Sequence, residues 1–164
     1  MDTLHLNDVA SVPKGHLKVF ARQVDSVVEE LVVDEDNLIV TAGKTFTRDK
    51  LSGEDTTNYI SAFAFGTGNT APDIADTDLE TPVYYSGTDY YKALQEYTNA
   101  TATKVTFIGW VSALEPVTQS VDLKECGLFT AAGATGGSMY CRATFDAITK
   151  NNTIELRLEY SQEF

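Results

Sequence analysis

The chain has 164 residues, with 24 acidic and 12 basic side chains and a net charge of −12 at pH 7. This length suits a single domain with a sizeable core. The excess of acids argues against nucleic acid as a partner, because sequence-independent binding to phosphates needs Lys and Arg. The chain also has no apolar run of 18 residues, so we expect no membrane partner.

The chain opens with "MDTLHLNDVASVPKG", which lacks the basic start and apolar stretch of a signal peptide. We interpret residues 1–15 as an N-terminal arm and residues 16–164 as one domain.

Most of the remaining chain has the residue pattern of β-strands. The clearest strand lies near the C-terminus, where Ile154, Leu156, Leu158 and Tyr160 alternate with polar residues. The other predicted strands, in chain order, are 16–24, 26–33, 37–43, 57–66, 104–111 and 138–145. Several short strands at this spacing predict a mainly β fold, an antiparallel β-sandwich that is jelly-roll-like or immunoglobulin-like.

Two segments have helical character, so the prediction includes one or two short helices. Residues 43–53 form a candidate helix that Gly53 would close as a C-terminal cap. Residues 88–97 form a second candidate of a turn or two, with Thr88 or Asp89 as its N-terminal cap.

A glycine pair, Gly66 and Gly68, ends the 57–66 strand and invites comparison with phosphate-binding loops. A phosphate loop needs backbone N–H groups and a neighbouring cation. Four acids follow instead, and their field would repel a phosphate: Asp73, Asp76, Asp78 and Glu80. We therefore favour a bend in which both glycines adopt positive φ.

Asp76, Asp78 and Glu80 place three carboxylates at alternate positions, an oxygen cluster of the kind that calcium binds. The alternative is that Asp76 caps a single helical turn and Leu79 packs beneath it. We favour the cap and therefore expect no cofactor; a bound cation such as calcium stays the open alternative.

Candidate catalytic residues are few. The two histidines, His5 and His16, lie in the N-terminal segment outside any metal or triad spacing. Ser11 and Lys14 have a serine–lysine spacing, but Pro13 lies between them in the arm. We therefore expect no enzyme.

Two stretches in a fixed order carry a resemblance to a known group of proteins. The first is "ISAFAFGTGNTAPDIADTDLETPV", and the second is "KECGLFTAAGATGGSMYCRATFDAITKNNTIELRLEY". Over residues 37–160 the chain resembles structural proteins of tailed bacterial and archaeal viruses, which are tail, fibre-associated or baseplate components. The resemblance implies no active site and a location in the virion.

The function expected from this resemblance is that of a non-enzymatic tail, baseplate or fibre-associated subunit. It would form a symmetric homo-oligomer and contact other virion proteins. Two alternatives stay open: a capsid-surface protein (decoration or turret), and a module that binds a host cell-surface glycan or receptor.

Five tyrosines fall within one short segment, namely Tyr84, Tyr85, Tyr90, Tyr91 and Tyr97. Tyrosine is enriched at recognition surfaces, but it also packs half-buried against sheets. Core and interface therefore stay open for this segment.

The two cysteines flank the glycine-rich stretch "AAGATGG". Equal counting from a hairpin tip at this stretch places Cys126 opposite Cys141 and Leu128 opposite Met139. Facing Cβ atoms in such a pair can approach disulfide range. In a reducing cytoplasm, two buried reduced thiols are the favoured alternative.

The acidity itself has two interpretations. Proteins of salt-loving hosts have such surfaces, because molar salt screens the self-repulsion of a large net charge. An ordinary acidic virion protein would have the same composition, so the halophilic interpretation needs a measurement.

Overall fold

The computed structural model describes residues 14–85, 87–101, 103–116, 120–130 and 137–163. Residues 1–13 of the predicted arm lie outside these ranges, whereas Lys14 and Gly15 belong to the first strand. The described elements are β1 (Lys14–Gln23), β2 (Glu30–Ile39), α1 (Thr41–Ser52), β3 (Ala62–Gly66), β4 (Lys92–Ala93), β5 (Glu96–Thr101), β6 (Lys104–Val111), β7 (Val121–Phe129), β8 (Met139–Lys150) and β9 (Ile154–Glu163).

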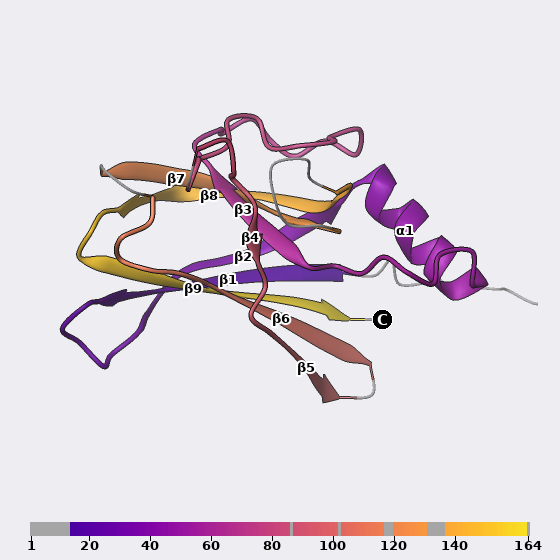
Figure 1. Ribbon diagram of the computed structural model, residues 1–164, viewed down its shortest axis with the longest axis horizontal. Coiled ribbons are helices and arrows are strands. Elements are labelled where there is room, and N and C mark those ends of the chain that lie inside the picture. The colour runs from indigo at the N-terminus through magenta and orange to yellow at the C-terminus, as the bar shows by residue number, and fades with distance from the viewer. Residues whose placement is uncertain (1–13, 86, 102, 117–119, 131–136, 164) are drawn as a thin grey trace, which may run out of the picture.

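The nine strands form one antiparallel sheet in the order β4-β3-β7-β8-β2-β1-β9-β6-β5. The sheet curls into a half-barrel, with α1 at one end (Figure 1). The prediction of a mainly β antiparallel fold with a short helix is confirmed. The curled sheet has two facing layers, which are parts of one continuous sheet and not two separate sheets. Strand β2 joins them, because it pairs with β1 along most of its length and with β8 at its C-terminal end.

Alternation along the strands builds the core. In β9, Leu156, Leu158 and Tyr160 are buried, and the residues between them are less buried. The curvature also brings β3 against β6: a Cβ atom at Gly109 would lie 2.4 Å from the ring of Phe63. Since the Phe63 ring takes the space of a side chain at this position, the two layers pack directly against each other.

Helix α1 follows β2 after Val40 and ends as the sequence predicts. Gly53 has φ 77° and its N–H donates to the carbonyl of Lys50, so it closes the helix in the left-handed conformation. Gly43 faces β8 so closely that a Cβ atom would lie 2.0 Å from the carbonyl oxygen of Tyr140. Phe46 then packs edge-on against the Tyr140 ring, with the ring centroids 6.1 Å apart.

The second predicted helix is wrong. The 88–97 segment contains β4 and the start of β5. Its aromatic residues have helical spacing, but Lys92 and Ala93 pair with β3 instead. Tyr91 is buried against Phe129 of β7, so tertiary packing decides the conformation of this segment.

The predicted hairpin of β7 and β8 is present, but the predicted register is wrong. Cys126 is paired with Ala143 and Leu128 with Cys141. On the tip side, Phe129 is paired with Met139, which is already one position away from the predicted register. The shift between Leu128 and Phe129 adds a second position, so Cys126 and Cys141 are not opposite each other.

Candidate functional site

A buried carboxylate, Glu125 of β7, holds the loop of residues 67–83 against the sheet. Its Oε1 accepts hydrogen bonds from the backbone N–H groups of Gly68 and Thr81, at 3.0 and 2.9 Å. Its Oε2 accepts from the N–H of Glu80 at 3.1 Å. One side chain thereby satisfies backbone donors from both ends of the loop.

Arg142 of β8 completes this cluster. Its Nε donates to Glu125 Oε2 at 2.9 Å and its Nη1 donates to Asp76 Oδ2 at 2.8 Å. Both Arg142 and Glu125 are buried, at 2% and 0% exposure. Burial disfavours the charged guanidinium, but the bonds to Asp76 and Glu125 outweigh it and raise the pKa of Arg142. The cluster thus keeps a full charge pair in the core.

The predicted positive φ of Gly66 and Gly68 is wrong. In the described residues only Gly53 and Gly87 have positive φ. A Cβ atom at Gly66 or Gly68 would instead lie 2.3 or 2.6 Å from Glu125 Oε1. The glycine pair therefore gives the buried carboxylate room to reach the backbone.

The three acids proposed for calcium have different partners. Asp76 and Glu80 both face Arg142, with Glu80 Oε2 3.6 Å from Nη2. Asp78 accepts a hydrogen bond from the Tyr90 hydroxyl at 2.5 Å. Within the described ranges, no group of three or more His, Cys, Asp or Glu side chains is placed to hold a metal ion. Calcium binding stays a prediction that this geometry does not favour.

The predicted helical turn capped by Asp76 is also absent. Asp76 Oδ2 accepts the N–H of Asp73 instead, which closes a turn inside the loop. Burial alone would raise the pKa of Asp76. The hydrogen bond from Asp73 and the interaction with Arg142 outweigh burial, so the pKa of Asp76 lies below its ordinary value. Leu79 is buried, as that interpretation expected.

The five tyrosines divide between core and surface. Tyr85 and Tyr91 are buried, and Tyr90 is half-buried. Tyr84 and Tyr97 are exposed, at 51% and 72%. The two exposed rings are therefore the members of the set that are free to contact a partner.

The two cysteines are free thiols in the core. Burial raises the pKa of Cys126 well above its ordinary value and raises that of Cys141 to about 12. Both thiols are therefore protonated at neutral pH and behave as small apolar groups.

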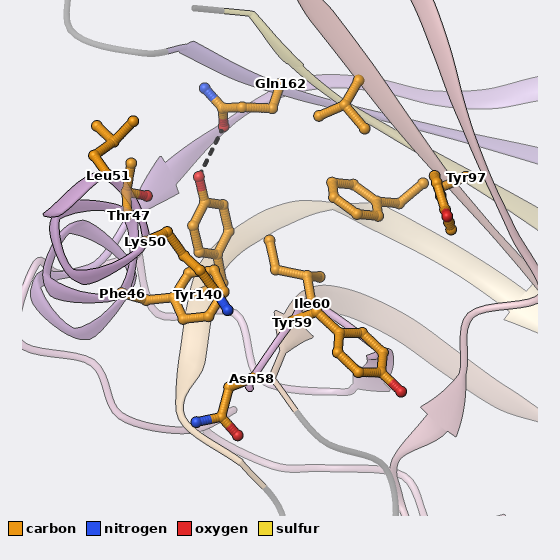
Figure 2. Close-up of a pocket in the computed structure, with 12 residues that line it drawn as sticks. Phe46, Thr47, Lys50, Leu51, Asn58, Tyr59, Ile60, Tyr97, Tyr140 and Gln162 are labelled. Carbon is orange, nitrogen blue, oxygen red and sulfur yellow. Dashed lines mark hydrogen bonds between the residues drawn. The ribbon is translucent and has the colours of Figure 1, made fainter. Parts of the chain in front are cut away.

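An apolar groove of about 680 Å³ opens between α1, the segment before β3 and the strands β5 and β6. Figure 2 shows the helix side chains on one side and Tyr97 on the other, with Tyr140 between them. The groove is lined by Phe46, Thr47, Lys50, Leu51, Asn58, Tyr59, Ile60, Tyr97, Val105, Phe107, Tyr140 and Gln162. An adjoining hollow of about 540 Å³ shares five lining residues with it, namely Asn58, Tyr59, Ile60, Tyr97 and Phe107.

The lining of the apolar groove differs from the rest of this acidic chain. None of the described residues that line it is an acid, and Lys50 is its one charged residue. Lys50 lies 5.5 Å above the Phe46 ring and 3.5 Å from Asp55. Leu51, Tyr59 and Tyr97 are 85%, 69% and 72% exposed. The groove therefore offers apolar surface to a partner, with one cation at its side.

His16 forms a second polar cluster that the sequence did not indicate. Its Nδ1 lies 2.9 Å from Asp36 Oδ1, and its Nε2 contacts Asp34. Partial burial lowers the pKa of His16, but the hydrogen bonds to both aspartates raise it by more. These hydrogen bonds join side chains of the adjacent strands β1 and β2 on the surface of the sheet.

Comparison of the chain with protein-family models, curated proteins and solved structures finds no match. In the described part of the chain, no helix is long and apolar enough to cross a membrane.

Proposed function

We propose that this chain is a non-enzymatic structural subunit of a tailed-virus particle, in the tail, baseplate or a fibre-associated position. The proposal rests on the ordered motifs of residues 37–160, by which the chain resembles such proteins. The apolar groove supports it, because an assembling subunit needs an apolar surface to bury against its neighbours.

The two motif stretches meet in space at the Glu125–Arg142 pair. The first stretch contributes Gly68 and Glu80, and the second contributes both members of the pair. The two stretches thus form one structural unit, a loop anchored on a buried ion pair. An anchored loop suits a subunit whose surface must keep one shape through assembly.

Quantitative mass spectrometry and immunogold microscopy of gradient-purified particles test the proposal. We expect multiple copies per particle, clustered at the tail or baseplate. Labelling over the capsid shell would replace this role with the capsid-surface alternative. A protein made during infection but missing from purified particles would contradict both roles.

Glycan binding is a second candidate, favoured by the exposed rings of Tyr59 and Tyr97 at the apolar groove. Aromatic faces stack on the apolar faces of sugars, and tyrosine serves many recognition surfaces. A glycan array with the purified protein tests this role. Binding that Tyr97→Ala abolishes and Tyr84→Ala leaves unchanged would support it, whereas an empty array would contradict it.

A further inference from the structure

The apolar groove lies beside the point where the chain enters the fold. Gly15, the second residue of β1, is paired with Gln162 of β9. Gln162 lines the groove and accepts a hydrogen bond from the Tyr140 hydroxyl at 3.4 Å (Figure 2). The first described residues of β1 therefore lie at the rim of this groove.

We propose that residues 1–12 of one copy bind the apolar groove of a neighbouring copy and so link subunits of the assembly. This inference rests on the proposed structural role and names the partner as a second copy of this chain.

The sequence of the segment complements the groove. "MDTLHLNDVASV" has apolar side chains at Leu4, Leu6, Val9 and Val12, and no Lys or Arg. In an extended chain Leu4 and Leu6 point to the same side, so one face of the segment can pack on the groove. Asp2 and Asp8 are opposite in charge to Lys50, the one charged residue of the described lining, which also lies 3.5 Å from Asp55.

The length of the segment and the proposed structural role favour a neighbouring copy. Twelve extended residues span at most roughly 40 Å, which is enough to cross to an adjacent subunit. An assembling subunit needs links of this kind between copies, so the proposed structural role favours a neighbouring copy as the receptor.

Strand β5 offers a place for the backbone of an incoming segment. It is an edge strand of the sheet, and its residue Tyr97 lines the groove. An extended segment can pair with such an edge while its side chains fill the neighbouring hollow. This mode of binding needs no rearrangement of the fold.

Photo-cross-linking of the full-length protein tests the inference. A benzophenone amino acid replaces Leu6, and copies with normal and heavy nitrogen isotopes are mixed by joint unfolding and refolding. We expect cross-links to peptides that contain Phe46, Leu51 or Tyr97, with the two isotopes combined in one product. Groove cross-links within single copies alone, or none in the groove, would overturn the proposal.

Paired variants show whether the groove itself is the receptor. Leu51→Glu puts a charge on an exposed groove residue, and Val27→Glu makes the same kind of change at a 94% exposed position in the turn between β1 and β2. We expect Leu51→Glu to lower the mixed cross-link yield about tenfold, the change that 1.4 kcal/mol produces, and Val27→Glu to leave it unchanged. Equal yields in the two variants would overturn the proposal.

Sedimentation gives a readout independent of the probe. Leu4→Asp with Leu6→Asp, outside the described fold, should convert an oligomer into a folded monomer. An oligomer that these changes leave intact would overturn the inference. The structural role would still be supported if the protein is present in purified particles. Absence from particles would remove the structural role whatever the cross-links show.

Discussion

The guanidinium of Arg142 meets the carboxylate of Glu125 between β8 and β7, with Nε 2.9 Å from Oε2 and both side chains excluded from solvent. The pair is local to two neighbouring strands, yet it determines where the 67–83 loop lies. The carboxylate binds the loop backbone, and the guanidinium binds its Asp76 side chain.

Replacing Arg142 with Met should destabilise the fold by about 3 kcal/mol or more, because Glu125 would remain buried without its countercharge. Guanidinium denaturation measures the loss. Adding Glu125→Gln to this variant removes the buried charge and should recover part of the lost stability. Arg48→Met, at an exposed arginine of α1, is the matched control and should leave the midpoint unchanged. Equal midpoints for Arg142→Met and the wild type would contradict this role of the pair.

Adding one methyl group at Gly68 should displace the loop. Its Cβ would lie 2.5 Å from the Cβ of Glu80 and 2.6 Å from Glu125 Oε1. We expect Gly68→Ala to cost about 1–3 kcal/mol, the range for overpacking a well-packed site. Thr67→Ala, at the preceding residue, removes atoms instead and serves as control. Thermal melts check the prediction, and a Gly68→Ala protein as stable as Thr67→Ala would refute it.

The stability of the protein should depend on pH through His16. Because its pKa is raised in the folded state, His16 adds stability below about pH 6.5, and this stability is lost as pH rises through the folded pKa. The loss of stability in His16→Gln should thus be larger at about pH 5.5 than at pH 8.5. Lys18, 3.9 Å from Asp34, remains at both pH values. His5→Gln is the control, and identical losses at both pH values would rule out the linkage.

The cysteines should be unreactive in the native protein. Since burial keeps both thiols protonated, a thiol reagent should label Cys126 and Cys141 only as fast as the fold opens. Adding denaturant should expose two reactive thiols per chain. Rapid labelling of the native protein, or an intact mass two units low from a disulfide, would contradict this expectation.

Salt should stabilise the protein if its acidity is an adaptation to high ionic strength. A melting temperature that rises steeply from dilute buffer to molar potassium chloride would support a salt-loving host, because screening removes self-repulsion. A variant with Gln at the exposed positions Glu30, Glu35 and Glu96 should show a shallower rise. A wild-type curve that stays flat above physiological salt would reject the halophilic interpretation.

Local patterns predicted the elements whose residues carry their own signal. The alternation in β9 and the glycine after α1 are signals that depend only on neighbouring residues in the chain. Both predictions are confirmed. The 88–97 segment failed because its spacing fitted a helix while packing on Phe129 decided the outcome. A one-dimensional pattern does not contain such a contact.

The apolar groove and the Glu125–Arg142 pair were missed for a related reason. The groove combines residues of α1, β5, β6, β8 and β9 with those of the segment before β3. None of these is unusual in its own stretch. Glu125 and Arg142 are polar residues in strands, and their burial follows only from the loop that covers them. The glycines at 66 and 68 were the available signal, since their need for space implied a close neighbour.

The position of β9 in the sheet affects how the protein is made. This strand follows all the other described strands along the chain, yet it pairs with β1 on one side and β6 on the other. While the ribosome is still translating, β1 and β2 have no connection through the sheet to β5 and β6. Chains emerge at about 5–20 residues per second, so the nascent protein exposes two unjoined sheet edges for several seconds. A product truncated before β9 would keep those edges open, and it would be a substrate for quality control rather than for assembly.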